Sequence, residues 1–109
     1  MKIAINGFGR IGRAAFKIAL EKGVEVAAIN DLGELENLAY LLKYDSAYGV
    51  YPHAVKTEEG FLLVDDKKIK VFSEKNPENL PWGELSVEVV LECTGIFTER
   101  ESCQQHLQA

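Results

Sequence analysis

The chain has 109 residues, a hydrophobic content of 47% and a formal net charge of −5, and its length and composition predict a single globular domain. The negative charge argues against nucleic acid or an anionic membrane as a partner, and no apolar run is long enough to span a membrane. Cys93 and Cys103 match no metal-ligand spacing. We therefore expect no metal site and two reduced thiols in a cytoplasmic protein.

The first segment of the chain predicts a nucleotide-binding loop. A short apolar strand over residues 3–5 leads into Gly7-x-Gly9-x-x-Gly12, and a helical pattern begins near Arg10. In this context Gly7 permits a sharp turn, Gly9 lets a pyrophosphate approach the backbone, and Gly12 lets the helix pack closely. The helix N-terminus then offers N–H groups and a positive dipole end to the phosphates.

The next two elements complete a strand–helix–strand unit. Residues 13–22 predict a helix with Ala15, Ile18 and Ala19 on its buried face, and Gly23 stands where a C-cap belongs. The apolar run over residues 24–29 predicts a strand that is covered on both faces.

Asp31 follows this strand, about 20 positions after the glycines, where dinucleotide-binding proteins place an acid for the ribose hydroxyls. Its charge disfavours a 2′-phosphate, so the sequence favours NAD over NADP. The alternative is that Asp31 only caps a helix or forms a turn before Gly33.

Residues 34–44 predict a second helix, because Leu35, Leu38, Ala39 and Leu42 repeat with helical spacing. Residues 53–73 predict an antiparallel ribbon with two turns. Its lysines, Lys67, Lys68 and Lys70, are interpreted as the solvated face of a strand, where lysine also blocks edge pairing.

The β-branched run over residues 87–91 predicts another central strand, and Trp82 is expected to be buried in a turn before it. Thr98 and Glu101 form a capping box, which predicts a helix from Glu99. The fold class is therefore α/β, a Rossmann-type doubly wound parallel sheet that is incomplete and carries the ribbon as an insertion.

Five blocks in the chain go beyond the glycine motif: residues 6–13 (NGFGRIGR), 29–32 (INDL), 41–46 (LLKYDS), 77–82 (PENLPW) and 92–98 (ECTGIFT). Together they resemble the N-terminal NAD-binding domain of phosphorylating glyceraldehyde-3-phosphate dehydrogenase, and the resemblance covers the whole chain. This glycolytic oxidoreductase converts an aldehyde to an acyl phosphate, with hydride transfer to NAD.

The resemblance implies a role for each matching residue. The backbone N–H groups of Arg10 and Ile11 would bind the pyrophosphate, and Asp31 would accept hydrogen bonds from the adenine ribose. The remaining implied contacts are Lys75 beside the adenine, Asn6 near the nicotinamide ribose, and Thr94, Gly95 and Phe97 along the groove.

The resemblance also implies what these residues do not contain. The nucleophilic cysteine and the histidine that activates it lie downstream in the family, so residues 1–109 are expected to be a truncated NAD-binding domain without the catalytic domain. Cys93, and Cys103 near His106, fit buried and surface thiols better than nucleophiles. We therefore predict no catalytic residue here and no activity for this chain alone. The resemblance also implies that the full-length family members form homotetramers.

Two alternatives remain. The chain could be a non-catalytic module that binds a nucleotide or that self-associates through an uncovered sheet edge. It also fits the coenzyme half of an erythrose-4-phosphate dehydrogenase, since the choice of aldehyde lies outside these residues.

Overall fold

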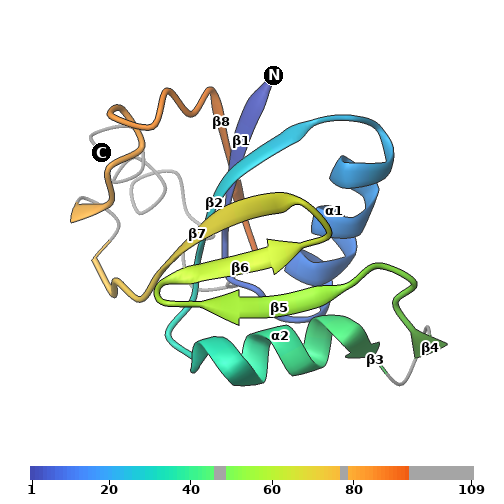
Figure 1. The fold of residues 1–109 in the computed structure, drawn as a ribbon. Coiled ribbons are helices and arrows are strands. Elements are labelled where there is room, and N and C mark those ends of the chain that lie inside the picture. Colours follow the sequence, from blue (N-terminus) through green and yellow to red (C-terminus); the bar gives the residue numbers. More distant parts are fainter. Residues whose placement is uncertain (46–48, 77–78, 94–109) are drawn as a thin grey trace.

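The computed structural model describes residues 1–45, 49–76 and 79–93 (Figure 1). In chain order the elements are β1 (Lys2–Asn6), α1 (Arg10–Glu21), β2 (Glu25–Asn30), α2 (Leu35–Lys43), β3 (Tyr44–Asp45), β4 (Gly49–Val50), β5 (Val55–Glu58), β6 (Phe61–Val64), β7 (Lys67–Phe72) and β8 (Val89–Glu92). Neither helix of these described residues has the length and apolarity needed to cross a membrane.

One six-stranded sheet organises the molecule, in the order β5-β6-β7-β2-β1-β8. The four strands β7, β2, β1 and β8 run parallel to one another, whereas β5 and β6 extend the sheet beyond β7 as an antiparallel hairpin. A parallel sheet with helical crossovers confirms the predicted α/β, Rossmann-type fold class.

The predicted ribbon needs one correction, because its last strand, β7, also pairs with a parallel strand of the sheet. β7 pairs antiparallel with β6 on one side and parallel with β2 on the other, so it is an inner strand. Its lysines therefore do not protect an edge. Instead the Nζ atoms of Lys68 and Lys70 lie 4.2 Å and 4.6 Å from the centre of the Phe61 ring. These distances are typical of cation–π interactions.

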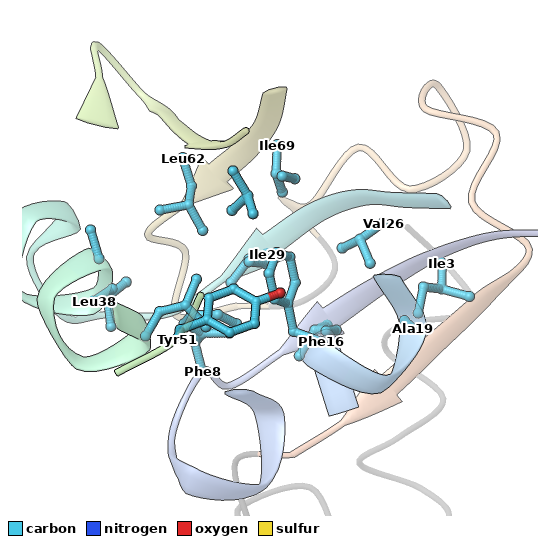
Figure 2. Close-up of a cluster of buried hydrophobic side chains, with 14 residues drawn as sticks. Ile3, Phe8, Phe16, Ala19, Val26, Ile29, Leu38, Tyr51, Leu62 and Ile69 are labelled. Atoms are coloured by element: carbon cyan, nitrogen blue, oxygen red, sulfur yellow. The ribbon is translucent and has the colours of Figure 1, made fainter. Parts of the chain in front are cut away.

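Both helices cover the same face of the sheet, where a single apolar cluster forms (Figure 2). Phe16 and Ala19 reach this cluster from α1, and Leu38, Ala39 and Leu42 reach it from α2. Three of the four residues of the predicted stripe, Leu38, Ala39 and Leu42, are thus confirmed as buried.

The predicted buried face of the first helix is wrong by part of a turn. Ile18 is 53% exposed, whereas Gly12, Phe16 and Ala19 are the buried residues of α1. These three have the i, i+4, i+7 spacing of one helical face, and the large Phe16 ring decides which face packs. Phe16 also meets Phe8 edge to face, with 5.5 Å between the ring centres.

Both ends of α1 involve a glycine, and the predicted role of Gly23 at the C-terminal end is confirmed. Gly9 is the N-cap, and Gly23 follows the last turn with a φ of +74°. The N–H groups of Gly23 and Val24 donate to the carbonyls of Leu20 and Ala19, so the left-handed glycine satisfies two terminal carbonyls of the helix.

A bulge in β2 lets its apolar run cover both faces. The pairing with β1 skips one residue, because Ile3 faces Val26 and Ala4 faces Ala28. As a result Val26 packs with the helices, while Ala28 joins a second cluster on the other face. That second cluster contains Leu80 and Trp82, so the predicted burial of the tryptophan in a turn is confirmed.

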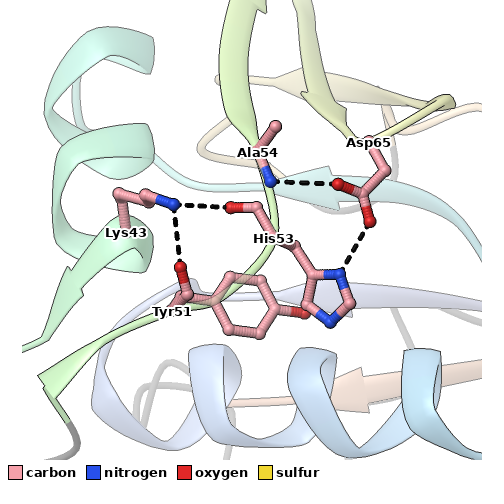
Figure 3. Close-up of polar contacts among 5 residues, drawn as sticks. All are labelled: Lys43, Tyr51, His53, Ala54 and Asp65. Atoms are coloured by element: carbon pink, nitrogen blue, oxygen red, sulfur yellow. Dashed lines mark hydrogen bonds and ion pairs between the residues drawn. The ribbon is translucent and has the colours of Figure 1, made fainter.

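A set of polar contacts holds the segment between β4 and β5 (Figure 3). Lys43 donates from Nζ to the carbonyls of Tyr51 and His53, each at 2.8 Å. Asp65 accepts the Ala54 N–H at 3.0 Å and pairs with His53 Nδ1 at 2.7 Å. These contacts tie the end of α2 to the turn between β6 and β7.

The predicted strand over residues 87–91 is present as β8, displaced by one or two residues, but among the described strands it lies at one end of the sheet and is not central. The helix predicted from Glu99 lies outside the described residues.

Candidate nucleotide-binding site

The candidate site lies where the carboxyl ends of β1, β2, β7 and β8 meet, because parallel strands end at the same edge of a sheet. Gly7–Gly9 follow β1, Asp31 follows β2, and Lys75 lies shortly after β7. The described candidate residues are therefore brought to one edge, although they are far apart in the sequence.

The three glycines of the loop have different structural surroundings, so each serves the loop in a different way. Gly7 has a φ of +96°, which L-residues rarely adopt, and its N–H donates to the Asn30 carbonyl at 2.7 Å. A Cβ on Gly12 would lie 2.0 Å from the Gly7 carbonyl oxygen, so only glycine fits this contact. At Gly9, no atom of the described residues other than its chain neighbours lies within 4 Å of such a Cβ.

The open space at Gly9 lies at the start of α1. The helix begins at Arg10, its first intrahelical acceptor is the Gly9 carbonyl, and within the described chain no side chain caps it and no acid occupies its first turn. The first N–H groups of a helix have no acceptor inside the helix. Arg10 and Ile11, both exposed, therefore present the kind of N-terminus that binds an anion.

Asp31 ties this loop to the end of β2. Its Oδ2 accepts the Phe8 N–H at 2.7 Å, and its Oδ1 accepts the Gly33 N–H at 2.8 Å. The predicted alternative, a turn role, is therefore present, and the contact with Phe8 is one that the sequence did not suggest. An ionised carboxylate accepts about four hydrogen bonds, so these two contacts leave capacity for ribose hydroxyls.

Two buried asparagines join the strand ends. Asn6 is 2% exposed and Asn30 is 4% exposed. Asn6 Nδ2 donates to Glu92 at 2.8 Å, and Asn6 Oδ1 accepts from Asn30 Nδ2 at 2.8 Å. Asn30 continues the series to the backbone of Glu74, donating to its carbonyl at 2.9 Å and accepting its N–H at 2.8 Å.

Sequence reasoning missed Asn30. The available signal was a polar side chain at the end of an otherwise apolar buried strand, a position that demands hydrogen-bond partners. Asn6 was expected near the nicotinamide ribose, and its side chain forms hydrogen bonds with Asn30 and Glu92. Lys75 is exposed, and Thr94, Gly95 and Phe97 lie outside the described residues.

Cys93 follows β8 and donates its N–H to the Asn6 carbonyl at 2.7 Å. Burial raises the pKa of its thiol, and the Glu92 carboxylate raises that pKa further. A raised pKa leaves little thiolate, which is the reverse of what a nucleophile needs. Among the described residues no group of three His, Cys, Asp or Glu side chains could hold a metal ion.

An open hollow of about 510 Å³ lies at the opposite edge of the sheet, lined by residues at the starts of strands, among them Lys2, Glu25 and Lys67. It contains none of the candidate residues. The site is therefore defined by the glycine loop and the strand ends, and the hollow plays no part in it.

Comparison with known proteins agrees with this geometry. Residues 1–100 match the family model described as glyceraldehyde 3-phosphate dehydrogenase, NAD binding domain. The chain is 53% identical to a glyceraldehyde-3-phosphate dehydrogenase of Borreliella burgdorferi, over 94% of this chain and 30% of that protein. It is 53% identical to that of Clostridium pasteurianum, over 99% of this chain and 33% of the relative. It is 50% identical to glyceraldehyde-3-phosphate dehydrogenase 1 of Kluyveromyces lactis, over 100% of this chain and 34% of the relative.

The chain thus spans about a third of the length of these curated relatives. The family model covers most of the chain, and the matched region includes the glycine loop. The chain belongs to the NAD-binding domain family of glyceraldehyde-3-phosphate dehydrogenase, and its cofactor is NAD.

Proposed function

We propose that this chain binds NAD at the carboxyl edge of its sheet and supplies the coenzyme half of a phosphorylating aldehyde oxidation. The observation that carries the proposal is the open N-terminus of α1 above Gly9, with Asp31 hydrogen-bonded to the same loop. In the complete reaction the substrate is glyceraldehyde 3-phosphate, and the product is an acyl phosphate.

The family resemblance implies the individual coenzyme contacts, and the arrangement of the described residues at this edge supports them. The N–H groups of Arg10 and Ile11 bind the pyrophosphate, which lies in the open space above Gly9. Asp31 accepts hydrogen bonds from the adenine ribose, and its charge excludes a 2′-phosphate. The remaining contacts are Lys75 beside the adenine, Asn6 near the nicotinamide ribose, and Thr94, Gly95 and Phe97 along the groove.

Titration calorimetry of the chain with NAD, ADP-ribose and NADP tests this proposal. We expect NAD and ADP-ribose to bind with similar, weakened affinity, because the adenine half of the site is present, and NADP to bind more weakly than either. No heat with NAD at millimolar concentration would contradict the proposal.

We further propose that residues 1–109 act as one NAD-binding domain in the cytoplasm, with the covalent steps performed by residues outside this region. The raised pKa of Cys93 supports this division, because the thiol is poorly suited to attack an aldehyde. The chain alone should therefore form no NADH from glyceraldehyde 3-phosphate and phosphate, a result that an absorbance assay checks directly.

Self-association is the second candidate function. In the described residues β8 stands at one end of the sheet order, and Val89 on it is 39% exposed. An end strand of this kind offers unpaired backbone groups to a second copy. Light scattering coupled to size-exclusion chromatography would show a dimer or larger species, such as the homotetramer of the family, whereas a monomer at all concentrations would contradict association.

A further inference from the structure

We propose that Asn30 is a positioning residue of the coenzyme site: its side-chain amide holds the segment after β7, which carries Lys75, in place against the glycine loop. The role is distinct from any contact with the coenzyme, because Asn30 is only 4% exposed. It acts through Glu74 and Asn6.

The argument begins with the hydrogen-bonding capacity of the amide. A side-chain amide has two N–H donors and one carbonyl acceptor. In Asn30 the donor nitrogen bonds to the Glu74 carbonyl and to Asn6 Oδ1, and the acceptor oxygen bonds to the Glu74 N–H. Both donors and the acceptor are therefore satisfied inside the protein, as a buried polar group requires.

The two bonds to Glu74 continue the sheet where its backbone ladder stops. The last parallel pair of β2 and β7 is Asn30 with Phe72, and the Asp31 N–H donates to the Phe72 carbonyl at 3.0 Å. Beyond this point Asn30 contacts both backbone groups of Glu74 with its side chain, in the manner of a further ladder residue. Lys75 is the next residue along the chain.

The Glu74 side chain in turn holds the residues that follow Lys75. Its Oε1 accepts the Asn76 N–H at 3.1 Å. The turn that presents Lys75 is thus held at Glu74 from β2 and at Asn76 from Glu74 itself. Meanwhile the Asn30 backbone carbonyl accepts the Gly7 N–H at 2.7 Å, so one residue contacts both the adenine-side segment and the phosphate-side loop.

The first test uses the unsubstituted chain. The Glu74 N–H lies outside every strand ladder, yet it should exchange slowly with solvent because Asn30 Oδ1 holds it. The exchange rate of the Glu74 N–H can be measured directly by NMR. Exchange as fast as in an unstructured peptide would overturn the inference before any variant is made.

The second test compares Asn30→Ala and Asn30→Asp with Asn79→Ala. Asn30→Asp keeps an acceptor for the Glu74 N–H but loses both donors, and it serves as the second variant if Asn30→Ala does not fold. Asn79 is exposed and contacts Glu74 Oε1 at 3.5 Å, so its substitution is the matched control. AMP probes the adenosine side of the site, and inorganic pyrophosphate probes the glycine loop.

We expect AMP to bind about tenfold more weakly to folded Asn30 variants, the size expected for losing a net one or two hydrogen bonds. Pyrophosphate affinity should hardly change, because the backbone carbonyl that holds Gly7 remains. Asn79→Ala should behave as the unsubstituted chain.

Equal losses of AMP and pyrophosphate affinity, or unchanged AMP affinity in a folded variant, would overturn this inference and leave the proposed function standing. This inference rests on the proposed function, and the two can fail separately. If the unsubstituted chain bound neither AMP nor NAD, the proposed function would fail and the role of Asn30 in the coenzyme site would fail with it.

Discussion

Gly9 and Gly12 belong to the same loop motif, yet the structure separates their roles. A Cβ on Gly12 would meet the Gly7 backbone at 2.0 Å, and backbone cannot move aside as a flexible side chain can. A Cβ on Gly9 would meet no described atom within 4 Å beyond its chain neighbours, and the φ of −79° at Gly9 is negative, as L-residues prefer. Folding therefore depends on Gly12, while the space above Gly9 is available to a ligand.

This difference predicts opposite outcomes for two alanine substitutions. Gly12→Ala should lower the free energy of unfolding by about 1–3 kcal/mol through overpacking. Gly9→Ala should leave it within about 0.5 kcal/mol but weaken NAD binding, because the methyl group occupies the approach to the backbone. Urea unfolding and NAD titration on both variants check this, and equal effects of the two substitutions on stability would contradict it.

Asp31 is expected to serve both the loop and the coenzyme. Asp31→Asn retains one carbonyl oxygen but replaces the other acceptor with an N–H₂ group, so the Phe8 or Gly33 contact is lost. We expect a loss of about 1–2 kcal/mol in stability, weaker NAD binding and a smaller preference for NAD over NADP.

The matched control is Asp66→Asn, which makes the same charge change on an exposed turn. It should alter neither stability nor coenzyme preference. If Asp31→Asn kept the full preference for NAD, the ribose role of Asp31 would be wrong even if the loop were destabilised.

The sequence predicted these residues because their signals are local. A glycine motif after a strand, and an acid at the next strand end, can be recognised within a short segment. Asn30 could not be recognised in this way, because its partner Glu74 is 44 positions away. Only the pairing of β2 with β7 brings them together.

At the scale of elements, β7 shows why pattern alone misplaced a strand. Its lysines alternate with Ile69 and Val71, and such alternation is shared by edge strands and by inner strands with one polar face. The chain passes through α2 and then through the β5–β6 hairpin before it forms β7, which lies between β6 and β2 and runs parallel to β2. The helical face of α1 was misjudged for a related reason, because periodicity gives a stripe but tertiary packing chooses between adjacent stripes.

The turn between β6 and β7 carries a pH-dependent contact (Figure 3). The hydrogen bond from His53 lowers the pKa of Asp65 from its ordinary value of 3.8, and the Ala54 N–H and the charges of His53 and Lys67 lower it further. A lowered folded-state pKa stabilises the fold above the unfolded-state pKa. That stabilisation disappears as the pH falls through the folded-state value.

We therefore expect the stability advantage of the unsubstituted chain over Asp65→Asn to be constant near neutral pH and to shrink below about pH 4. Unfolding by urea at a series of pH values measures it. In a His53→Gln background the same comparison should show a smaller pH dependence, because the first cause of the shift is gone. An advantage that grew on acidification would contradict this assignment.

At the scale of the whole molecule, the two faces of the sheet are covered by different means. The helices α1 and α2 pack on one face (Figure 2). The segment around Trp82 packs on the other face. There Trp82 lies against Ala4 and Ala28 of the central strands and meets Phe72 edge to face, with 6.2 Å between the ring centres. The small alanines of β1 and β2 leave the room that this indole fills.

The second face therefore depends heavily on one side chain, which is 2% exposed. Trp82→Ala should lower the free energy of unfolding by about 3–5 kcal/mol, a large part of the roughly 5–15 kcal/mol available to a domain. Circular dichroism during urea unfolding is the suitable probe, because the substitution removes the only tryptophan.

Ile18→Ala provides the contrast, since Ile18 lies 53% exposed on α1 and should change stability by about 0.5 kcal/mol or less. Trp82→Phe should fall between the two, because it keeps the ring contact with Phe72 and loses part of the buried volume. If Trp82→Ala were no more destabilising than Ile18→Ala, the segment around Trp82 would not be part of the core. The carboxyl-edge site would then rest on a sheet held from the helical face alone.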